Sequence, residues 1–203
     1  MENQEYLNQI AAQARPTEAP GRGGIFKSKL FLGLVAVIGV LTVVMIVVAI
    51  ISGNKSAGPD ELGFSLQMHI EGTSSIINKY QPLVKSSVLR SSSASLNTIL
   101  SDTNAGLTNY LSGLSAKPKV ENLRVAADTA RDELDQELFA AKINGNLDRV
   151  YAHKMTYEIE LLAAEENKLI NLTKSDKLKE LLTKSYSSLE TLYDQFNDFS
   201  EAK

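Results

Sequence analysis

The sequence contains no cysteine and no tryptophan, and only two of its 203 residues are histidine. Without thiols the chain cannot form disulfides, zinc–thiolate sites, iron–sulfur clusters or a cysteine nucleophile. With two histidines, a metal site would have to consist mostly of carboxylates. The formal net charge of -3 argues against nucleic acid as the main partner. These shortages narrow the chemistry that is open to the chain.

His69 and His153 are the residues around which a metal site could be built. In a helical bundle they could be joined by Glu71, Glu158, Glu160, Glu165 or Glu166. Di-iron bundles need Glu-x-x-His on two helices, so that both ligands point the same way. The residues three before the two histidines are Leu66 and Val150, so the spacing predicts no metal site. We expect His69 to be a hydrogen-bonded residue at the core or its boundary, and His153 to lie at the surface.

One uncharged run of 22 residues, Leu30 to Ile51, has Thr42 as its only polar side chain. As an α-helix it would be about 33 Å long, enough for a hydrocarbon core of roughly 30 Å. A cleaved signal peptide fits less well, because its apolar region is only about 7–15 residues long. In this chain 29 residues also precede the run. We therefore predict a retained, single-pass transmembrane helix at residues 30–52.

Positive charges flank this run unequally. Arg22, Lys27 and Lys29 lie directly before it, and Lys55 is the only cation close after it. The positive-inside rule then places the N-terminus in the cytoplasm and the rest of the chain outside the cell or in the periplasm. The predicted parts are a short, largely disordered cytoplasmic tail (1–29), the transmembrane helix (30–52), a linker (53–58) and an ectodomain (59–203).

From Pro59 onward, apolar residues recur at spacings of three and four, which is typical of amphipathic helices. No strand-like alternation interrupts the pattern. The Ser-rich stretch 86–95 is either a turn or a frayed helix start, and Thr173 and Asp176 match a capping box before the last helix. Breaks at Pro82, 113–118, 145–146 and 173–176 divide the ectodomain into five helical segments. We expect an all-α fold, with the transmembrane helix followed by an antiparallel four- to five-helix bundle.

The apolar stripes of these helices also predict the core of the bundle. Leucines from all five segments are expected to face inward, namely Leu66, Leu100, Leu134, Leu162, Leu182 and Leu189. The stripes of the third and fourth segments extend the expected core to Leu123, Ala127, Ala130 and Leu172. Such a domain is long enough to bury one core without disulfides or metals.

The segment Leu147-Asp148-Arg149-Val150-Tyr151, with Met155, Glu160 and Leu162 after it, resembles one helix of a ferritin-like family of uncharacterised bacterial envelope proteins. The resemblance covers residues 120–200, including the Leu-rich last helix. It implies a helical bundle in the cell envelope. Where members of that family often have a histidine in this helix, Ile159 stands here, so the resemblance does not support a metal-linked role.

No set of nucleophile, base and orienting group can be nominated in the sequence, so we do not expect an enzyme or a cofactor. The leading hypothesis is a non-enzymatic, single-pass protein of the cell membrane that binds a protein partner or another copy of itself. The expected partners are therefore the lipid bilayer and a protein, with no nucleic acid. The alternative is an extracytoplasmic bundle that senses a ligand or a metal and works with a separate output protein.

Overall fold

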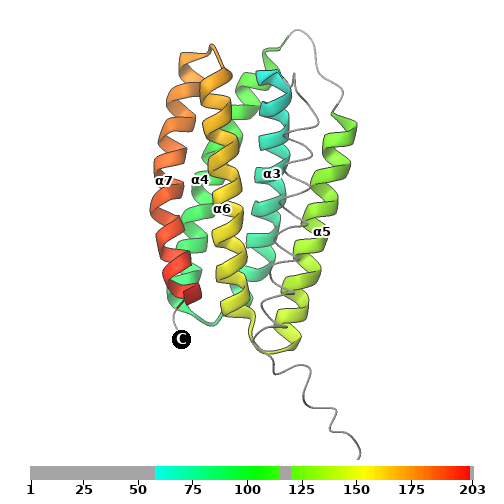
Figure 1. Cartoon of the computed structure of the whole chain (residues 1–203), viewed down its shortest axis with the longest axis vertical. Coiled ribbons are helices and arrows are strands. Elements are labelled where there is room, and N and C mark those ends of the chain that lie inside the picture. The colour runs from blue at the N-terminus through cyan, green and yellow to red at the C-terminus, as the bar shows by residue number, and fades with distance from the viewer. Residues whose placement is uncertain (1–57, 115–119, 202–203) are drawn as a thin grey trace, which may run out of the picture. The chain divides into compact units, whose positions relative to one another are not determined.

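The computed structural model of the protein describes residues 58–114 and 120–201, which are almost entirely helical and contain no β-strand. Their elements are α3 (Pro59–Tyr80), the 3-10 helix η1 (Gln81–Leu83), α4 (Ser87–Ser112), α5 (Glu121–Ile143), α6 (Leu147–Leu172) and α7 (Asp176–Glu201). The five α-helices run up and down alternately (Figure 1). The predicted all-α bundle is thus confirmed for the described part of the chain.

The membrane predictions concern a different part of the chain. Among the helices of residues 58–114 and 120–201, none has the length and apolarity needed to cross a membrane. The predicted transmembrane helix at 30–52 lies outside the described residues, as do the orienting cations Arg22, Lys27 and Lys29. The anchor and its direction stay predictions.

Helix α5 lies on the flank of a body formed by the other four helices. The α3 helix packs against α4 and α6, and α7 packs against α4 and α6, whereas α5 packs against α3 and α6 at the edge of the bundle (Figure 1). Among the described elements, a helix at the flank is covered on one side only. Accordingly, the predicted inward stripe of α5 is fully buried only in its second half, at Leu134, Leu138 and Ala141, and half-buried at Leu123, Ala127 and Ala130.

The core is one continuous apolar cluster with side chains from all five helices. The leucines predicted from the sequence lie in it, each at most 9% exposed: Leu66, Leu100, Leu134, Leu162, Leu182 and Leu189. Tyr151 and Phe196 meet edge to face, with ring centroids 6.4 Å apart. Leu172 is 46% exposed, so the prediction that it faces inward is wrong. It is the last residue of α6, where the stripe runs past the packed part of the helix.

The connection between α3 and α4 is held by side chains from two helices. Ser86 caps α4, because its Oγ accepts a hydrogen bond from the Leu89 backbone N–H at 3.3 Å. Asp148, in the first turn of α6, accepts hydrogen bonds from the N–H groups of Lys85 and Ser86 at 3.0 and 2.8 Å. The Ser-rich stretch 86–95 is therefore a capped helix start rather than a turn.

Ser175, and not Thr173, caps the last helix. The Oγ of Ser175 accepts a hydrogen bond from the Leu178 N–H at 3.3 Å, while Thr173 Oγ1 accepts one from the N–H of Ser175 itself. A capping box needs its Ser or Thr directly before the first helical residue. Because α7 begins at Asp176, the box predicted from Thr173 and Asp176 does not form.

The connection between α5 and α6 turns at Gly145, whose φ is +72°. Glycine adopts this left-handed conformation without the steric cost that a Cβ would bring. Asn146 directly precedes α6, at the predicted break 145–146, but its side chain makes no capping hydrogen bond. The break between α5 and α6 therefore depends on the backbone conformation of Gly145 and not on a cap from the Asn146 side chain.

Candidate functional site

Three of the residues considered for a metal site come together between α3 and α6. His69 Nε2 lies 2.8 Å from Glu158 Oε2, and His69 Nδ1 lies 3.2 Å from Glu165 Oε2. Thr73 Oγ1 donates a further hydrogen bond to Glu158 at 3.2 Å. The three charged side chains are 13–19% exposed. We call His69, Glu158 and Glu165 the His69 bridge.

The His69 bridge is an ion-pair network rather than a metal site. Each ring nitrogen faces a different carboxylate, so the three side chains do not converge on one point where an ion would be held. No group of three or more potential ligands in the described ranges could hold a metal. Burial alone would lower the pKa of His69, but the charge of Glu165 and hydrogen bonds with Glu158 and Glu165 outweigh it and raise the pKa to about 10. The histidine is therefore a cation at neutral pH.

A second carboxyl, Glu166, lies one residue further along α6 and faces α7. Ser185 Oγ donates to Glu166 Oε1 at 2.7 Å and accepts a hydrogen bond from Thr103 Oγ1 of α4 at 2.8 Å. Glu166 is fully buried, and its Oε2 has no hydrogen-bond partner within the described residues. Two successive hydrogen bonds thus connect Thr103 of α4, Ser185 of α7 and Glu166 of α6.

Burial raises the pKa of Glu166 to about 8. The hydrogen bond from Ser185 lowers it and the nearby charge of Glu165 raises it, and both effects are smaller than that of burial. A buried carboxylate oxygen without a partner is costly, so Glu166 is mainly neutral at pH 7. The sequence predicts neither the burial nor the neutrality, because a glutamate inside a helix is usually solvated.

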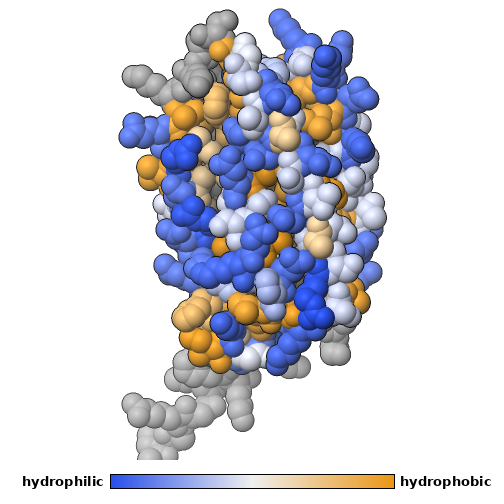
Figure 2. All heavy atoms as spheres, turned by 180° about the vertical axis from the view of Figure 1, so that it is seen from behind, coloured by the Kyte–Doolittle hydropathy of each residue, from blue (hydrophilic) through white to orange (hydrophobic). Residues whose placement is uncertain are grey.

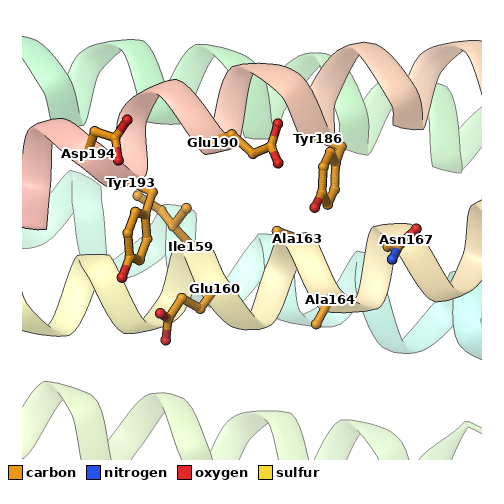
Figure 3. Close-up of a pocket in the computed structure, with 9 residues that line it drawn as sticks. All are labelled: Ile159, Glu160, Ala163, Ala164, Asn167, Tyr186, Glu190, Tyr193 and Asp194. Carbon is orange, nitrogen blue, oxygen red and sulfur yellow. The ribbon is translucent and has the colours of Figure 1, made fainter.

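A surface groove between α6 and α7 is the candidate binding site. Its volume is about 620 Å³, and nine residues line it: Ile159, Glu160, Ala163, Ala164 and Asn167 from α6, and Tyr186, Glu190, Tyr193 and Asp194 from α7 (Figure 3). The two alanines leave room between the helices, because no longer side chain fills that space. We call this feature the α6–α7 groove.

Aromatic rings and carboxylates share the α7 wall of this groove. Tyr186 and Tyr193 both reach from α7 toward α6, on either side of Ala163 (Figure 3). They are seven residues apart, which is two helical turns, so they lie on the same face of α7. The charge of Glu190 and a hydrogen bond with it, aided slightly by burial, raise the pKa of Tyr186. The tyrosine and the carboxylate thus form one polar unit at the groove.

The face opposite the view of Figure 1 is mostly hydrophilic, with apolar surface near the upper end of the bundle and also near its lower end (Figure 2). Of the large apolar side chains that are exposed in the described ranges, four belong to elements that meet at the lower end: Leu83, Val88, Phe139 and Ile143. The α6–α7 groove, by contrast, brings aromatic rings and carboxylates together around one hollow. The groove is therefore the stronger candidate for specific recognition.

Sequence reasoning singles out His69 and the core leucines but misses the groove. The predicted hydrogen-bonded histidine is present, and its partners Glu158 and Glu165 were among the residues weighed for a metal site. The signal for the groove was the heptad spacing of Tyr186 and Tyr193, with small residues on the preceding helix. That signal becomes specific only when α6 and α7 are known to pack side by side.

In comparisons with known proteins, no family model, no curated protein and no solved structure matches the chain. The resemblance of residues 120–200 to ferritin-like envelope proteins stays a prediction. In this fold the residues that carry it hold the bundle together. Asp148 fixes the α3–α4 connection, and Tyr151 Oη donates a hydrogen bond to Ser93 Oγ of α4 at 2.9 Å.

Proposed function

We propose that this chain is a non-enzymatic, single-pass membrane protein of the cell envelope, whose extracytoplasmic bundle binds a protein partner at the α6–α7 groove. The observation that carries the binding role is the groove itself, a surface hollow that combines two tyrosines with three carboxylates. Tyrosines are enriched in protein-binding surfaces because they offer a large rigid area and a polar tip. The membrane part of the proposal rests on the uncharged run Leu30 to Ile51 and its flanking cations.

The titratable groups with strongly shifted pKa values support binding over catalysis. His69 has both ring nitrogens engaged by carboxylates, and Glu166 is fully buried. A general acid or base must reach the substrate atom with which it exchanges a proton. In the described residues neither group borders the α6–α7 groove. Their surroundings fit roles in holding the helices together.

The membrane part is tested with single cysteines, since the natural chain has none. We expect Ala202→Cys to react with a membrane-impermeant maleimide in intact cells, and Ala11→Cys to react only after permeabilisation. Release of the protein by alkaline extraction, or labelling of Ala11→Cys in intact cells, would contradict the anchor or its direction.

The binding part is tested by placing a photo-crosslinking amino acid at Ala164, an exposed residue of the groove. The matched control carries the crosslinker at Ser101, an exposed residue of α4. We expect a discrete crosslinked protein from the first position and none from the second. Equal crosslinking from both positions, or none from either, would count against the groove as the binding surface.

A further inference from the structure

The charged side chains that line the α6–α7 groove are all acidic. Glu160, Glu190 and Asp194 contribute three carboxylates, and none of the described residues that line it is a lysine, an arginine or a histidine. A hollow bordered by charges of one sign concentrates the opposite charge and repels its own. The groove therefore disfavours phosphate, nucleic acid and acidic peptides, and favours a cation.

The two tyrosines of the groove indicate which kind of cation it can bind. Figure 3 shows Tyr186 and Tyr193 at the two ends of a space over Ala163 and Ile159, which form a small apolar floor. Cationic side chains bind well against aromatic faces, arginine in particular, because its flat guanidinium stacks on a ring while it pairs with a carboxylate. The long apolar stem of such a side chain also fits a floor of alanine and neighbouring ring carbons.

The length of the groove sets the size of its occupant. Its lining extends over residues 159–167 of α6 and 186–194 of α7. Eight helical steps correspond to about 12 Å, and an extended chain rises roughly 3.3 Å per residue, so three or four residues fill the length. A short extended segment fits these dimensions.

We propose that the α6–α7 groove binds an arginine-bearing extended segment of a protein partner, with the arginine stem above Ala163, between Tyr186 and Tyr193, and its guanidinium against Glu190 and Asp194. This assignment rests on the proposed function and adds the chemistry of the partner. Lysine satisfies the charge but not the stacking, so arginine binds more tightly than lysine.

The test uses the full-length chain in micelles of an uncharged detergent and a fluorescein-labelled Gly-Arg-Gly-Arg-Gly peptide. Fluorescence anisotropy should show binding that weakens as salt rises. The matched peptide with citrulline in place of arginine keeps the length and the flat end group, but it has a carbonyl oxygen in place of one donor group and carries no charge, and it should bind at least about tenfold more weakly. The lysine peptide should lie between the two.

Matched variants assign the binding to the groove. Tyr186→Leu, and the pair Glu190→Gln with Asp194→Asn, should each weaken peptide binding by about tenfold, whereas Tyr186→Phe, which keeps the ring, should weaken it by less than about threefold. The control pair Asp102→Asn with Glu121→Gln removes two exposed charges on α4 and α5 and should change the affinity by less than about twofold. Unchanged melting curves establish that each variant is folded.

Several outcomes would overturn the assignment. Equal binding of the citrulline peptide, or equal loss in the groove and control pairs, would show that binding is not the proposed recognition. Tighter binding of free spermine with the same variant pattern would assign the groove to a small cation instead of a protein segment. If no peptide binds but the crosslinker at Ala164 still captures a protein, the arginine assignment is wrong and the proposed function stands. If both fail, the proposed function fails as well.

Discussion

The two sides of α6 hold buried carboxyls in opposite ways. Toward α3, Glu158 and Glu165 lie against a histidine with a raised pKa, so the His69 bridge keeps its charges in a largely buried place. Toward α7, Glu166 meets only the hydroxyl of Ser185, and its pKa is raised instead. The difference lies in the partner: the carboxyls on the α3 side lie against a histidine cation, and the carboxyl on the α7 side receives a hydrogen bond from a neutral hydroxyl.

Both arrangements make the bundle less stable as the pH rises, each over a different pH range. The pKa of Glu166 is higher in the folded chain than the ordinary 4.5, so unfolding becomes easier as pH rises from about 4.5 to about 8. The pKa of His69 is also raised, from 6.5 to about 10, so its stabilisation is complete below pH 6.5 and is lost toward pH 10. Substitutions on each side of α6 should separate these two contributions to the pH dependence of stability.

The largest expected effect is the pH dependence that Glu166 causes. Between pH 4.5 and 8, the free energy of unfolding of Glu166→Gln should rise relative to the natural chain by roughly 3 kcal/mol, because glutamine cannot ionise. Chemical denaturation of the bundle alone, residues 59–203, followed by circular dichroism, measures this difference. Glu180→Gln, at an exposed position of α7, is the control and should show no such trend. A flat difference for Glu166→Gln would mean that Glu166 is ionised in the folded bundle.

Replacing His69 should have the next largest effect. His69→Ala leaves Glu158 and Glu165 without their shared cation, and we expect the free energy of unfolding at pH 7 to fall by about 2–3 kcal/mol, somewhat less than for a fully buried pair. His153→Ala removes an exposed histidine from α6 and should cost less than about 0.5 kcal/mol. Equal effects of the two substitutions would show that the His69 bridge adds no stability.

The cost of His69→Ala should itself depend on pH. As the natural chain loses the proton of His69 toward pH 10, the difference between the two chains should shrink by about 1–2 kcal/mol between pH 7 and pH 9.5. The same denaturation series, extended to alkaline pH, measures it. A difference that grows with pH would contradict the raised pKa of His69.

The sequence predicted the fold of the described residues better than it predicted the chemistry. Helical spacing identified the five helices and their core leucines, because burial of one apolar stripe is a property of each helix alone. The fully buried Glu166 could not be found in this way, since nothing in its own helix indicates that Thr103 and Ser185 lie opposite it. The groove likewise exists only in the pairing of α6 with α7.

The local ends of helices were predicted less reliably than their centres, for a related reason. Thr173 and Ser175 are both good caps, and which of them begins α7 is decided by how the connection packs after Leu172. In the sequence, Asp148 looks like an ordinary acidic residue in the first turn of a helix. In the structure it accepts hydrogen bonds from Lys85 and Ser86, 62 or more residues earlier in the chain. Contacts of this range are set by the tertiary fold.

The smallest effect is expected for an ion pair at the surface, which completes the comparison between buried and solvated charge. Lys79 Nζ donates to both carboxylate oxygens of Asp135 at 2.6 and 2.8 Å, a closer geometry than that of the His69 bridge. Its side chain is 53% exposed, however, so water already solvates most of the charge that the pair would offset. Lys79→Ala should therefore shift the melting temperature of the bundle by no more than about 2 °C, and less in high salt.

Tyr80 also donates to Asp135, through its hydroxyl, and keeps that contact between α3 and α5 when the lysine is removed. Melting at low and high salt measures the effect. A shift as large as that of His69→Ala would show that hydrogen-bond geometry, rather than burial, decides what a charge contributes in this bundle.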